Sequence, residues 1–427
     1  MPRAMVDAAS AAAVVAPICE AVRSEGEPAL RRLSQQFDAV VPASLRVDPA
    51  IAAAAAEELD PALRESLEVA IGRRRQVCQA EAAVPEPVIR FDGVDSPTGE
   101  TAEVAIRSIP VNRVGCYIPG GLAPLASSVY MNVVPAQAAG VPSIAIASPP
   151  QKEYGGLPHP TILATAHLLG VTEIYAVGGA QALAMFAYGV DGLCSPVDLL
   201  AGPGNVYVVA AKRLLRGVVG IDSEAGPTEI AVIADETADP ALVAADLISQ
   251  AEHDPLAASV LICCSEEVAR RVDAEVQAQV ASTKHRHRAS IALEGSQSAV
   301  VLCRDIDQAV AVADAYAAEH LEIMTADARQ VAARITNAGA IFVGRCAPVS
   351  LGDYAAGSTH VLPTTGAARF SSGLNARTFL RTVHVIDYDA QGLSVVADAA
   401  ERIALAEDLP AHARAITIRA ERLGESA

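Results

Sequence analysis

The sequence contains no tryptophan, and aromatic residues make up only 4% of its 427 positions. It is also poor in basic side chains, with 32 Lys and Arg against 50 Asp and Glu, so that the formal net charge is −18. A chain with this charge balance repels phosphate backbones and anionic lipid headgroups. We therefore expect neither a nucleic-acid-binding protein nor a protein bound to a membrane surface.

No uninterrupted apolar stretch reaches the length of about 18 residues that a membrane-spanning helix needs. The apolar run at 11–18 could pass for part of a signal peptide, but a single arginine precedes it and charged helical sequence follows. We interpret it as an amphipathic helix of a cytoplasmic protein. The cysteines include no Cys-x-x-Cys pair and are typical of buried small residues in a reducing compartment. They are Cys19, Cys78, Cys116, Cys194, Cys263, Cys264, Cys303 and Cys346.

A chain of this length exceeds the usual size of one hydrophobic core, so two or more domains are expected. Residues 10–38 and 50–82 show the spacing of helices. Short β-rich runs then alternate with helical segments, which predicts parallel βαβ units. The expected strands are 143–148, 173–179 and 197–202 in a first set, and 228–235, 259–264, 299–303 and 340–344 in a second set.

These two sets predict an α/β protein with two incomplete Rossmann-like, doubly wound domains. The expected larger domain combines residues 1–108 with 227–362, and the expected inserted domain is 109–226. A C-terminal tail, 363–427, is expected to be mostly helical at 396–423.

Three glycine-rich stretches lie where an expected strand ends or a helix begins: "YIPGG" (117–121), "VGGAQA" (177–182) and "AGPGN" (201–205). Exposed amides at a helix N-terminus favour anionic ligands such as a pyrophosphate. None of the three matches G-x-G-x-x-G, and each is also compatible with an ordinary βα turn. Together they indicate a possible dinucleotide or phosphate site in the 109–226 domain.

The tripeptide Ala-Glu-His occurs twice in a chain with nine histidines. In "SQAEHD" it ends a predicted helix, where Gln250 and His253 are three residues apart and project from one face. This pair is either half of a metal site or an exposed helix end. In "AAEHLE" the adjacent Glu319 and His320 would enter one cleft only if the helix breaks before them. Such a pair could transfer protons, although a surface histidine is the alternative.

Two further stretches place ionisable residues outside the predicted strands. The glycine-rich "SLGDYAAGSTHVLPT" (350–364) contains Asp353 and His360, and a loop of this composition is a candidate site. The tail contains "AEDLPAHARA", with Glu407 and His412, where Pro410 marks a helix start.

Read in order, these segments resemble histidinol dehydrogenase. The resemblance extends from about residue 20 to residue 423, and ten segments in the same order carry it. They are "VGCYIPGG", "SSVYMNVVPAQAAGV", "VGGAQALAMFAYG", "AGPGNVYVVAAKRL", "GIDSEAGPTEI", "ADLISQAEHD", "AAEHLE", "GAIFVG", "LGDYAAGSTHVLPT" and "EDLPAHA".

The resemblance implies an aldehyde-dehydrogenase-like architecture and a homodimer in which the tails are exchanged between subunits. It implies oxidation of L-histidinol to L-histidine through L-histidinal, the last steps of histidine biosynthesis. The expected cofactors are NAD and one Zn²⁺ ion per subunit. The metal would clamp the substrate through its imidazole and amine nitrogens.

The same resemblance implies a role for each candidate residue. His320 is the expected base and Glu319 the expected activator of water. The expected zinc ligands are Gln250, His253, Asp353 and His412, the last of them reaching the partner subunit. The expected substrate contacts are these four ligands together with Thr228, His320, His360 and Glu407. The expected NAD contacts are Tyr117, Gln181 and Asn205.

Three alternatives remain at this point. Cys116 lies beside a glycine-rich turn and could act as a nucleophile, as the cysteine of aldehyde dehydrogenases does through a thiohemiacetal. A paralogous enzyme could oxidise another small alcohol, and many members carry Ser where this chain has Thr228. A catalytically inactive relative would be expected to lack some of the candidate residues, yet all of them are present.

Overall fold

The computed structural model describes residues 3, 8–91, 102–120, 124–224 and 226–424. The chain forms two compact units, the first from residues 1–82 and 111–379 and the second from residues 83–110 and 380–427. Each unit is described by itself. Among the described residues, no helix is both long and apolar enough to cross a bilayer.

The first unit begins with four helices, α1 (Ala8–Glu25), α2 (Glu27–Phe37), α3 (Pro49–Glu57) and α4 (Pro61–Ala82). The helical prediction for 10–38 and 50–82 is correct in type, but each stretch is divided in two. Gly26 separates α1 from α2 because its φ of 65° is a left-handed conformation that ends a helix. Pro61 begins α4, and the residue before a proline disfavours the helical conformation.

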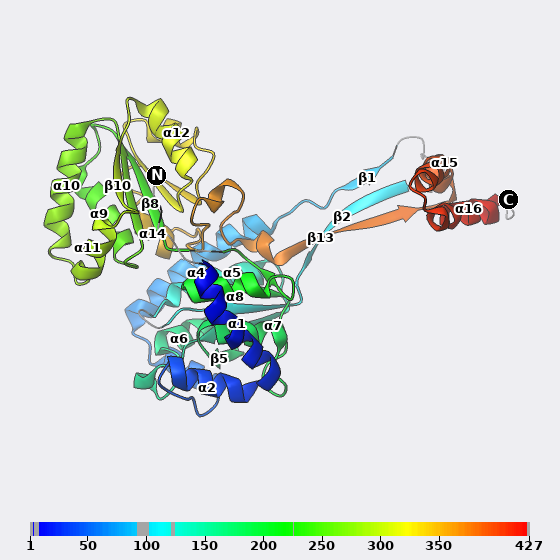
Figure 1. The fold of residues 1–427 in the computed structure, drawn as a ribbon, viewed down its shortest axis with the longest axis horizontal. Coiled ribbons are helices and arrows are strands. Elements are labelled where there is room, and N and C mark those ends of the chain that lie inside the picture. The colour runs from blue at the N-terminus through cyan, green and yellow to red at the C-terminus, as the bar shows by residue number, and fades with distance from the viewer. Residues whose placement is uncertain (1–2, 4–7, 92–101, 121–123, 225, 425–427) are drawn as a thin grey trace. The chain divides into compact units, whose positions relative to one another are not determined.

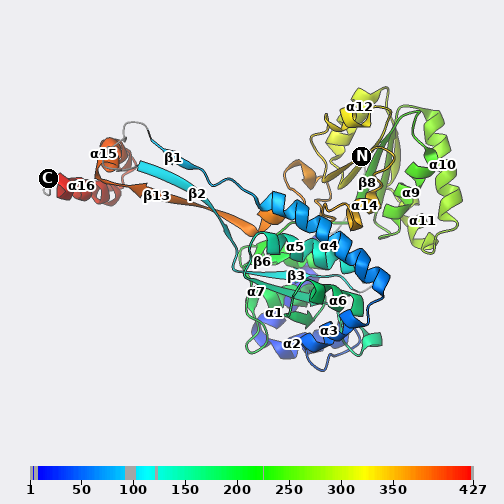
Figure 2. The same ribbon diagram turned by 180° about the vertical axis from the view of Figure 1, so that it is seen from behind.

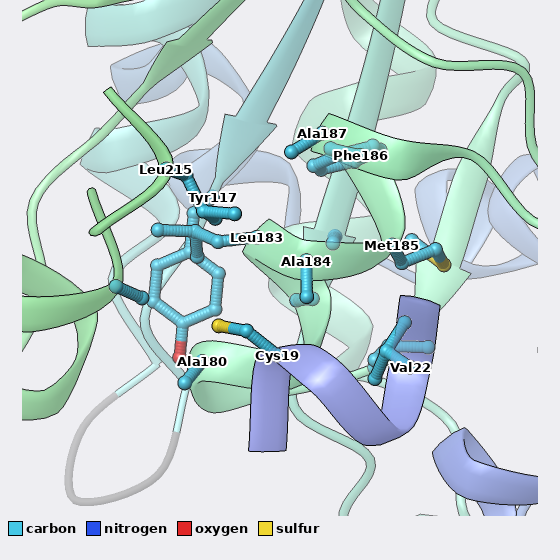
Figure 3. Close-up of a cluster of buried hydrophobic side chains, with 14 of the residues drawn as sticks. Cys19, Val22, Tyr117, Ala180, Leu183, Ala184, Met185, Phe186, Ala187 and Leu215 are labelled. Atoms are coloured by element: carbon cyan, nitrogen blue, oxygen red, sulfur yellow. The ribbon is translucent and has the colours of Figure 1, made fainter. Parts of the chain in front are cut away.

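A parallel five-stranded sheet, the first sheet, lies in this unit with the strand order β5-β4-β3-β6-β7. Its strands are β3 (Arg113–Tyr117), β4 (Ser143–Ser148), β5 (Ile174–Ala176), β6 (Leu199–Ala201) and β7 (Gly220–Ile221). The helices between them are α5 (Ala126–Ala138), α6 (Pro160–Leu168), α7 (Gly179–Tyr188) and α8 (Val206–Leu215). Side chains of α1, α7 and α8 form one buried cluster with this sheet. Figure 3 shows part of the cluster, with Cys19 and Val22 of α1 beside Tyr117 and Ala184.

The second sheet of the same unit is also parallel and has the order β10-β9-β8-β11-β12. Its strands are β8 (Glu229–Ala234), β9 (Ala258–Cys263), β10 (Ala299–Leu302), β11 (His320–Met324) and β12 (Ala340–Val343). Its helices are α9 (Pro240–Ala251), α10 (Glu266–Val280), α11 (Arg286–Glu294), α12 (Ile306–Tyr316), α13 (Ala328–Ala332) and α14 (Val349–Tyr354). One face packs against α9, α10 and α14, and the other packs against α12 and α13 (Figure 1).

In both sheets the first strand along the chain lies beside the fourth, so the connections reverse direction at that pair. The pair is β3 and β6 in the first sheet and β8 and β11 in the second. The candidate residues of the first sheet lie at the carboxyl edge of its pair, and those of the second sheet lie at the amino edge. Tyr117 ends β3 and the "AGPGN" turn follows β6, at the carboxyl edge, whereas Thr228 precedes β8 and His320 begins β11, at the amino edge.

The second unit contains an antiparallel sheet in the order β1-β2-β13, followed by two helices (Figure 2). Its elements are β1 (Val88–Arg90), β2 (Ala102–Pro110), β13 (Leu380–Tyr388), α15 (Ala390–Ala406) and α16 (Pro410–Gly424). The sequence analysis expected the two helices but none of the three strands. Short 3₁₀ helices complete the described chain in the first unit, at Lys152–Tyr154, Ala367–Arg369 and Ala376–Phe379.

The predicted α/β class, with two parallel sheets and a helical C-terminal segment, is confirmed. The predicted strand 299–303 agrees with β10 to within one residue at each end. The exact domain limits proposed from the sequence stay a prediction.

Candidate active site

Glu319 and His320 lie at a break between a helix and a strand, as the sequence analysis required for a joint role. Helix α12 ends at Tyr316, Ala317 adopts a left-handed conformation with φ 50°, and β11 begins at His320. Both side chains are buried, with 6% and 3% of their surface exposed. Gly339 fixes this backbone, because a Cβ atom at Gly339 would come within 2.5 Å of the Glu319 carbonyl oxygen. Any side chain at that position would therefore displace Glu319.

The Glu319 carboxylate is held at the amino ends of the central strands β8 and β11. Its Oε2 accepts a hydrogen bond from the Thr228 hydroxyl at 2.5 Å and another from the Glu229 amide at 2.9 Å. Two donors on one carboxylate oxygen fix the orientation of the group. The "GPTE" segment thus supplies the hydroxyl and the amide that position Glu319.

The His320 imidazole has different surroundings at its two nitrogens. Nδ1 lies 3.2 Å from the Glu229 carbonyl oxygen, which can only accept, so we assign the ring hydrogen to Nδ1. Nε2 is buried and has no hydrogen-bond partner within the described part of the chain. The nearest anion to Nε2 is Asp353, whose Oδ1 is 3.7 Å away. Nε2 is therefore the nitrogen that is free to exchange a proton.

Burial and charge raise the pKa values of both groups of this pair. Burial raises the pKa of Glu319 to about 7, against the opposing effect of the His320 charge and the Thr228 hydroxyl. Burial alone would lower the pKa of His320, but the carboxylates of Glu319 and Asp353 outweigh it and raise this pKa to about 9. The His320 Nδ1 and the Glu319 Oε2 are 3.5 Å apart. Groups with such shifts in one buried site are candidates for proton transfer.

Gln250 and His253 sit at the C-terminal end of α9. Gln250 is almost fully buried, and its amide donates a hydrogen bond to the Thr228 hydroxyl. Its Oε1 is buried without a partner among the described residues. His253 follows the helix in a turn closed by its own amide, which donates to the Gln250 carbonyl at 3.2 Å. The residue is exposed, and partial loss of hydration lowers the pKa of its imidazole.

Asp353 lies in the last turn of α14, near the rings of His320 and His360. Burial acts to raise the pKa of Asp353, but His320 and the charges of His360 and His253 lower it overall. His360 uses both ring nitrogens, since Nδ1 lies 3.2 Å from the Asp353 carbonyl oxygen and Nε2 lies 3.1 Å from the Ser128 hydroxyl. Burial lowers the pKa of His360, so its neutral form is favoured.

One network of contacts therefore joins six of the predicted residues in the first unit. It runs from Gln250 through Thr228 to Glu319, on to His320 and Asp353, and from Asp353 to His360. The seventh residue, His253, interacts with Asp353 through its charge. The two remaining members of the predicted substrate and metal set, Glu407 and His412, lie in the second unit. Both are exposed, Glu407 at the end of α15 and His412 in the first turn of α16.

The donor set in the first unit suits a divalent metal ion. Gln250 offers an unpartnered carbonyl oxygen, Asp353 an ionised carboxylate and His253 a neutral imidazole. Borderline ions such as zinc accept this mixture of nitrogen and oxygen ligands. The described residues contain no group of three or more His, Cys, Asp or Glu arranged to hold an ion.

The three predicted NAD contacts are at the carboxyl edge of the first sheet. The Tyr117 hydroxyl accepts a hydrogen bond from the Gly179 amide at 3.1 Å, and its ring packs beside Ala180 and Leu183 (Figure 3). Gln181 is buried in the first turn of α7. Asn205 caps α8, with its Oδ1 accepting from the Tyr207 and Val208 amides, and the residue is exposed.

A buried ion pair that the sequence analysis missed holds the "AGPGN" turn. Lys212 donates to the Gly202 carbonyl oxygen at 2.5 Å and to Asp222 at 2.5 Å. Asp222 in turn accepts the Gly202 amide at 2.8 Å. Both polar groups of Gly202 are therefore fixed at the switch point between β3 and β6.

Other contacts near the site also escaped the sequence analysis. The Ser128 hydroxyl forms a hydrogen bond with His360, which is 232 positions away in the sequence. Arg3 pairs with the carboxylate of Glu229 at 2.5 Å and stacks over the Tyr316 ring at 4.2 Å. The sequence analysis quoted the segments that contain Ser128 and Glu229 but gave no role to either residue or to Arg3.

Cys116 is not placed for nucleophilic catalysis. It is fully buried within β3, and burial strongly raises the pKa of its thiol. A nucleophilic cysteine needs a lowered pKa and access to the substrate. The structure therefore argues against the thiohemiacetal alternative.

We accordingly expect Cys116→Ser to retain kcat within roughly tenfold of the wild-type value, because the thiol only fills space in the sheet. Steady-state rates of NADH formation measure this. A loss of about a hundredfold or more, in protein with an unchanged thermal midpoint, would restore the covalent alternative.

Comparison with known proteins adds independent information. A family model described as histidinol dehydrogenase matches residues 1–420. Histidinol dehydrogenase of Cutibacterium acnes is 60% identical over 428 residues, covering 99% of this chain and 96% of the relative. That of Thermobifida fusca is 57% identical, covering 99% of this chain and 94% of the relative. The crystal structure of histidinol dehydrogenase from Elizabethkingia anophelis has a TM-score of 0.89 and 32% identity, covering 99% of this chain and 94% of that chain.

Proposed function

The chain belongs to the histidinol dehydrogenase family and is an oxidoreductase, and on that premise we propose that it oxidises L-histidinol to L-histidine through L-histidinal with NAD. The observation that carries the proposal is the buried Glu319–His320 pair, in which one group can accept the proton of an alcohol and the other can activate water. These two proton transfers are what a four-electron oxidation of an alcohol to a carboxylate requires.

His320 serves as the base in the first oxidation. Its Nε2 is the unpartnered nitrogen, and the Glu229 carbonyl holds the opposite side of the ring. Removal of the hydroxyl proton from the bound alcohol makes hydride loss favourable. The neighbouring carboxylates of Glu319 and Asp353 stabilise the imidazolium that forms.

Glu319 serves in the second oxidation. An aldehyde must gain water before it can lose a second hydride, and a carboxylate can take the proton from that water. The Thr228 hydroxyl and the Glu229 amide hold Oε2, so the orientation of Glu319 is preset. The burial of the pair keeps bulk water away from the reactive aldehyde.

NAD would lie at the carboxyl edge of the first sheet, with Tyr117, Gln181 and Asn205 as its contacts. When bound, NAD supplies the hydride acceptor for both oxidations. The support is the switch point between β3 and β6, the site where open α/β sheets bind ligands. The N-termini of α7 and α8 also lie at this edge and favour anionic groups.

One zinc ion per subunit would be held by Gln250, His253, Asp353 and His412. When bound, the ion supplies a Lewis acid that clamps nitrogen ligands of the substrate. Its support is the unpartnered Gln250 Oε1 together with the ionised Asp353 and the neutral His253. Thr228, His320, His360 and Glu407 complete the proposed substrate contacts.

A homodimer with exchanged tails would bring Glu407 and His412 into the site of the partner subunit. The second unit exposes large apolar side chains that a partner could cover: Val385, Ile386, Val395, Ile403, Leu405 and Leu409. Ile386 is 70% exposed and Ile403 is 61% exposed, which is costly for a surface in water.

All eight cysteines are free, which supports the proposed location in the cytoplasm.

The yield of NADH per molecule of L-histidinol tests the proposed function. We expect two molecules of NADH for each molecule of L-histidinol consumed, because the aldehyde stays bound between the two oxidations. The measurement is absorbance at completion with limiting substrate and excess NAD. A yield of one would mean that the reaction stops at the aldehyde.

An amino alcohol without the imidazole ring is the matched control. It lacks one of the two nitrogen donors, so we expect a lower kcat/KM than for L-histidinol. Equal or better turnover of that alcohol would favour a paralogous enzyme with another substrate.

A further inference from the structure

Two acidic side chains beneath the site, Asp246 and Glu322, have no role in the mechanism above. Asp246 lies in α9 and is 6% exposed, and Glu322 lies in β11 and is fully buried. Each of the two carboxyl groups affects the pKa of the other, which places them next to each other. Neither oxygen of Glu322 meets an N–H or hydroxyl donor in the described part of the chain. The two carboxyl groups must therefore satisfy each other.

Such a pair needs a proton. Two ionised carboxylates in contact inside a protein repel each other and have no hydrogen to share, whereas one proton gives an O–H···O⁻ bond. Burial, followed by the charge of Asp246, raises the pKa of Glu322 to about 9. Burial also raises the pKa of Asp246, but the hydrogen bonds from Glu322 and the Val349 amide oppose this. The proton thus belongs on Glu322, and Asp246 is the ionised acceptor.

Among the described residues around Glu322, no second charged group acts on its carboxyl group. In the flanking strands the residues opposite Glu322 are apolar, Val232 in β8 and Phe342 in β12. His320 projects from the same face of β11, two residues earlier, and is engaged by Glu229, Glu319 and Asp353. Among the described residues, Asp246 is the ionisable group whose charge acts on Glu322.

The pair joins the three elements that carry the site. Asp246 is one helical turn before Gln250 on α9, and Glu322 follows His320 on the same face of β11. Asp246 also accepts the amide of Val349 at 3.2 Å. Val349 is the first residue of α14, the short helix that carries Asp353. The side chain of Asp246 therefore contacts both of the other elements.

We propose that Asp246 and Glu322 are positioning residues that share one proton and thereby hold α9, β11 and α14 in register, so that the ends of these elements form the site. Neither side chain touches the substrate. The proposal deepens the proposed function and rests on it for the activity measurement, but the measurement of stability is independent of it.

Two variants of equal length separate a hydrogen-bonding role from a space-filling role. Glu322→Gln removes the titratable group but keeps a donor for Asp246, whereas Glu322→Met keeps the volume and removes the donor. We expect Glu322→Gln to retain kcat within roughly threefold, since the bond is preserved. We expect Glu322→Met to lose about tenfold to a hundredfold in kcat, because small displacements of catalytic groups are costly.

The pH dependence of the thermal midpoint of metal-free protein shows whether a proton is held. Glu322 is already ionised in the unfolded chain above its ordinary pKa of 4.5, whereas the folded chain keeps the proton up to about pH 9, so unfolding between about pH 6 and about pH 9 releases one proton. Stability should therefore fall as pH rises in the wild type, and the midpoint of the wild type relative to Glu322→Gln should decrease across this range. The difference reports on the Asp246–Glu322 pair, because all other groups are common to both proteins.

Equal losses of kcat in the Gln and Met variants would overturn the proposal, because a donor would then be irrelevant. A difference in midpoint that does not change with pH would overturn the shared proton. If the wild type does not oxidise L-histidinol, the proposed function fails, while the pH-dependent midpoint still decides whether the two carboxyl groups share a proton.

Discussion

Replacement of His320 by Asn is expected to reduce both oxidations by about a thousandfold or more, since positioned proton transfer contributes about 10² to 10⁴ in rate. The Asn amide can still donate to the Glu229 carbonyl, which Nδ1 of His320 now contacts at 3.2 Å. What the variant lacks is the basic Nε2. Rates of NADH formation from L-histidinol and from L-histidinal, measured separately, test both steps.

Metal content and folding distinguish loss of the base from loss of the site. Zinc should remain bound to the His320→Asn protein, because His320 is not among the proposed ligands, and the thermal midpoint should change little. His287→Asn is the matched control, as His287 is exposed on α11, and it should leave both rates unchanged. Near-normal oxidation by His320→Asn would remove His320 from the mechanism, whereas loss of zinc would make it a ligand.

The parallel sheets were predictable because their strands are buried on both faces. Such strands appear as short, continuous apolar runs, as in "SVLICC" and "TEIAVIAD", and their helices fill the intervals. The two Ala-Glu-His tripeptides stood out because histidine is scarce in the chain. Local sequence was sufficient for both inferences.

The antiparallel sheet of the second unit was not predictable in this way. Leu380 pairs with Pro110 and Tyr388 with Ala102, so the partner strands are more than two hundred positions apart. β13 is largely exposed, and its sequence "LRTVHVIDY" has little of the apolar continuity of the buried strands. The tail therefore looked mostly helical.

Within the site, sequence identified the reactive groups but not the contacts that fix them. Glu319, His320 and Asp353 were named from their segments. Their geometry depends on distant partners, such as Ser128 for His360 and Asp246 for the amide of Val349. The position of the pair at the amino edge of the second sheet was also unexpected, since ligands of such sheets usually bind at the carboxyl edge. No local pattern encodes these long-range contacts.

Replacement of Glu319 by Gln is expected to separate the two oxidations. Oxidation of L-histidinol to the aldehyde should stay within about tenfold of the wild-type rate, because His320 keeps its Nε2. Oxidation of L-histidinal should fall by about 10² to 10³, because the amide cannot take a proton from water. The two rates are measured with each substrate under conditions that saturate the enzyme with NAD.

The pH profile provides a second measurement of the same role. Burial raises the pKa of Glu319 to about 7, and only the ionised carboxylate can accept a proton. Aldehyde oxidation by the wild type should therefore rise with pH through about 7, and Glu319→Gln should lose this rise. Glu252→Gln, in the other Ala-Glu-His, is the matched control and should change the two steps by the same factor. Equal losses of both steps in Glu319→Gln, with the rise still present, would reject the division of labour between Glu319 and His320.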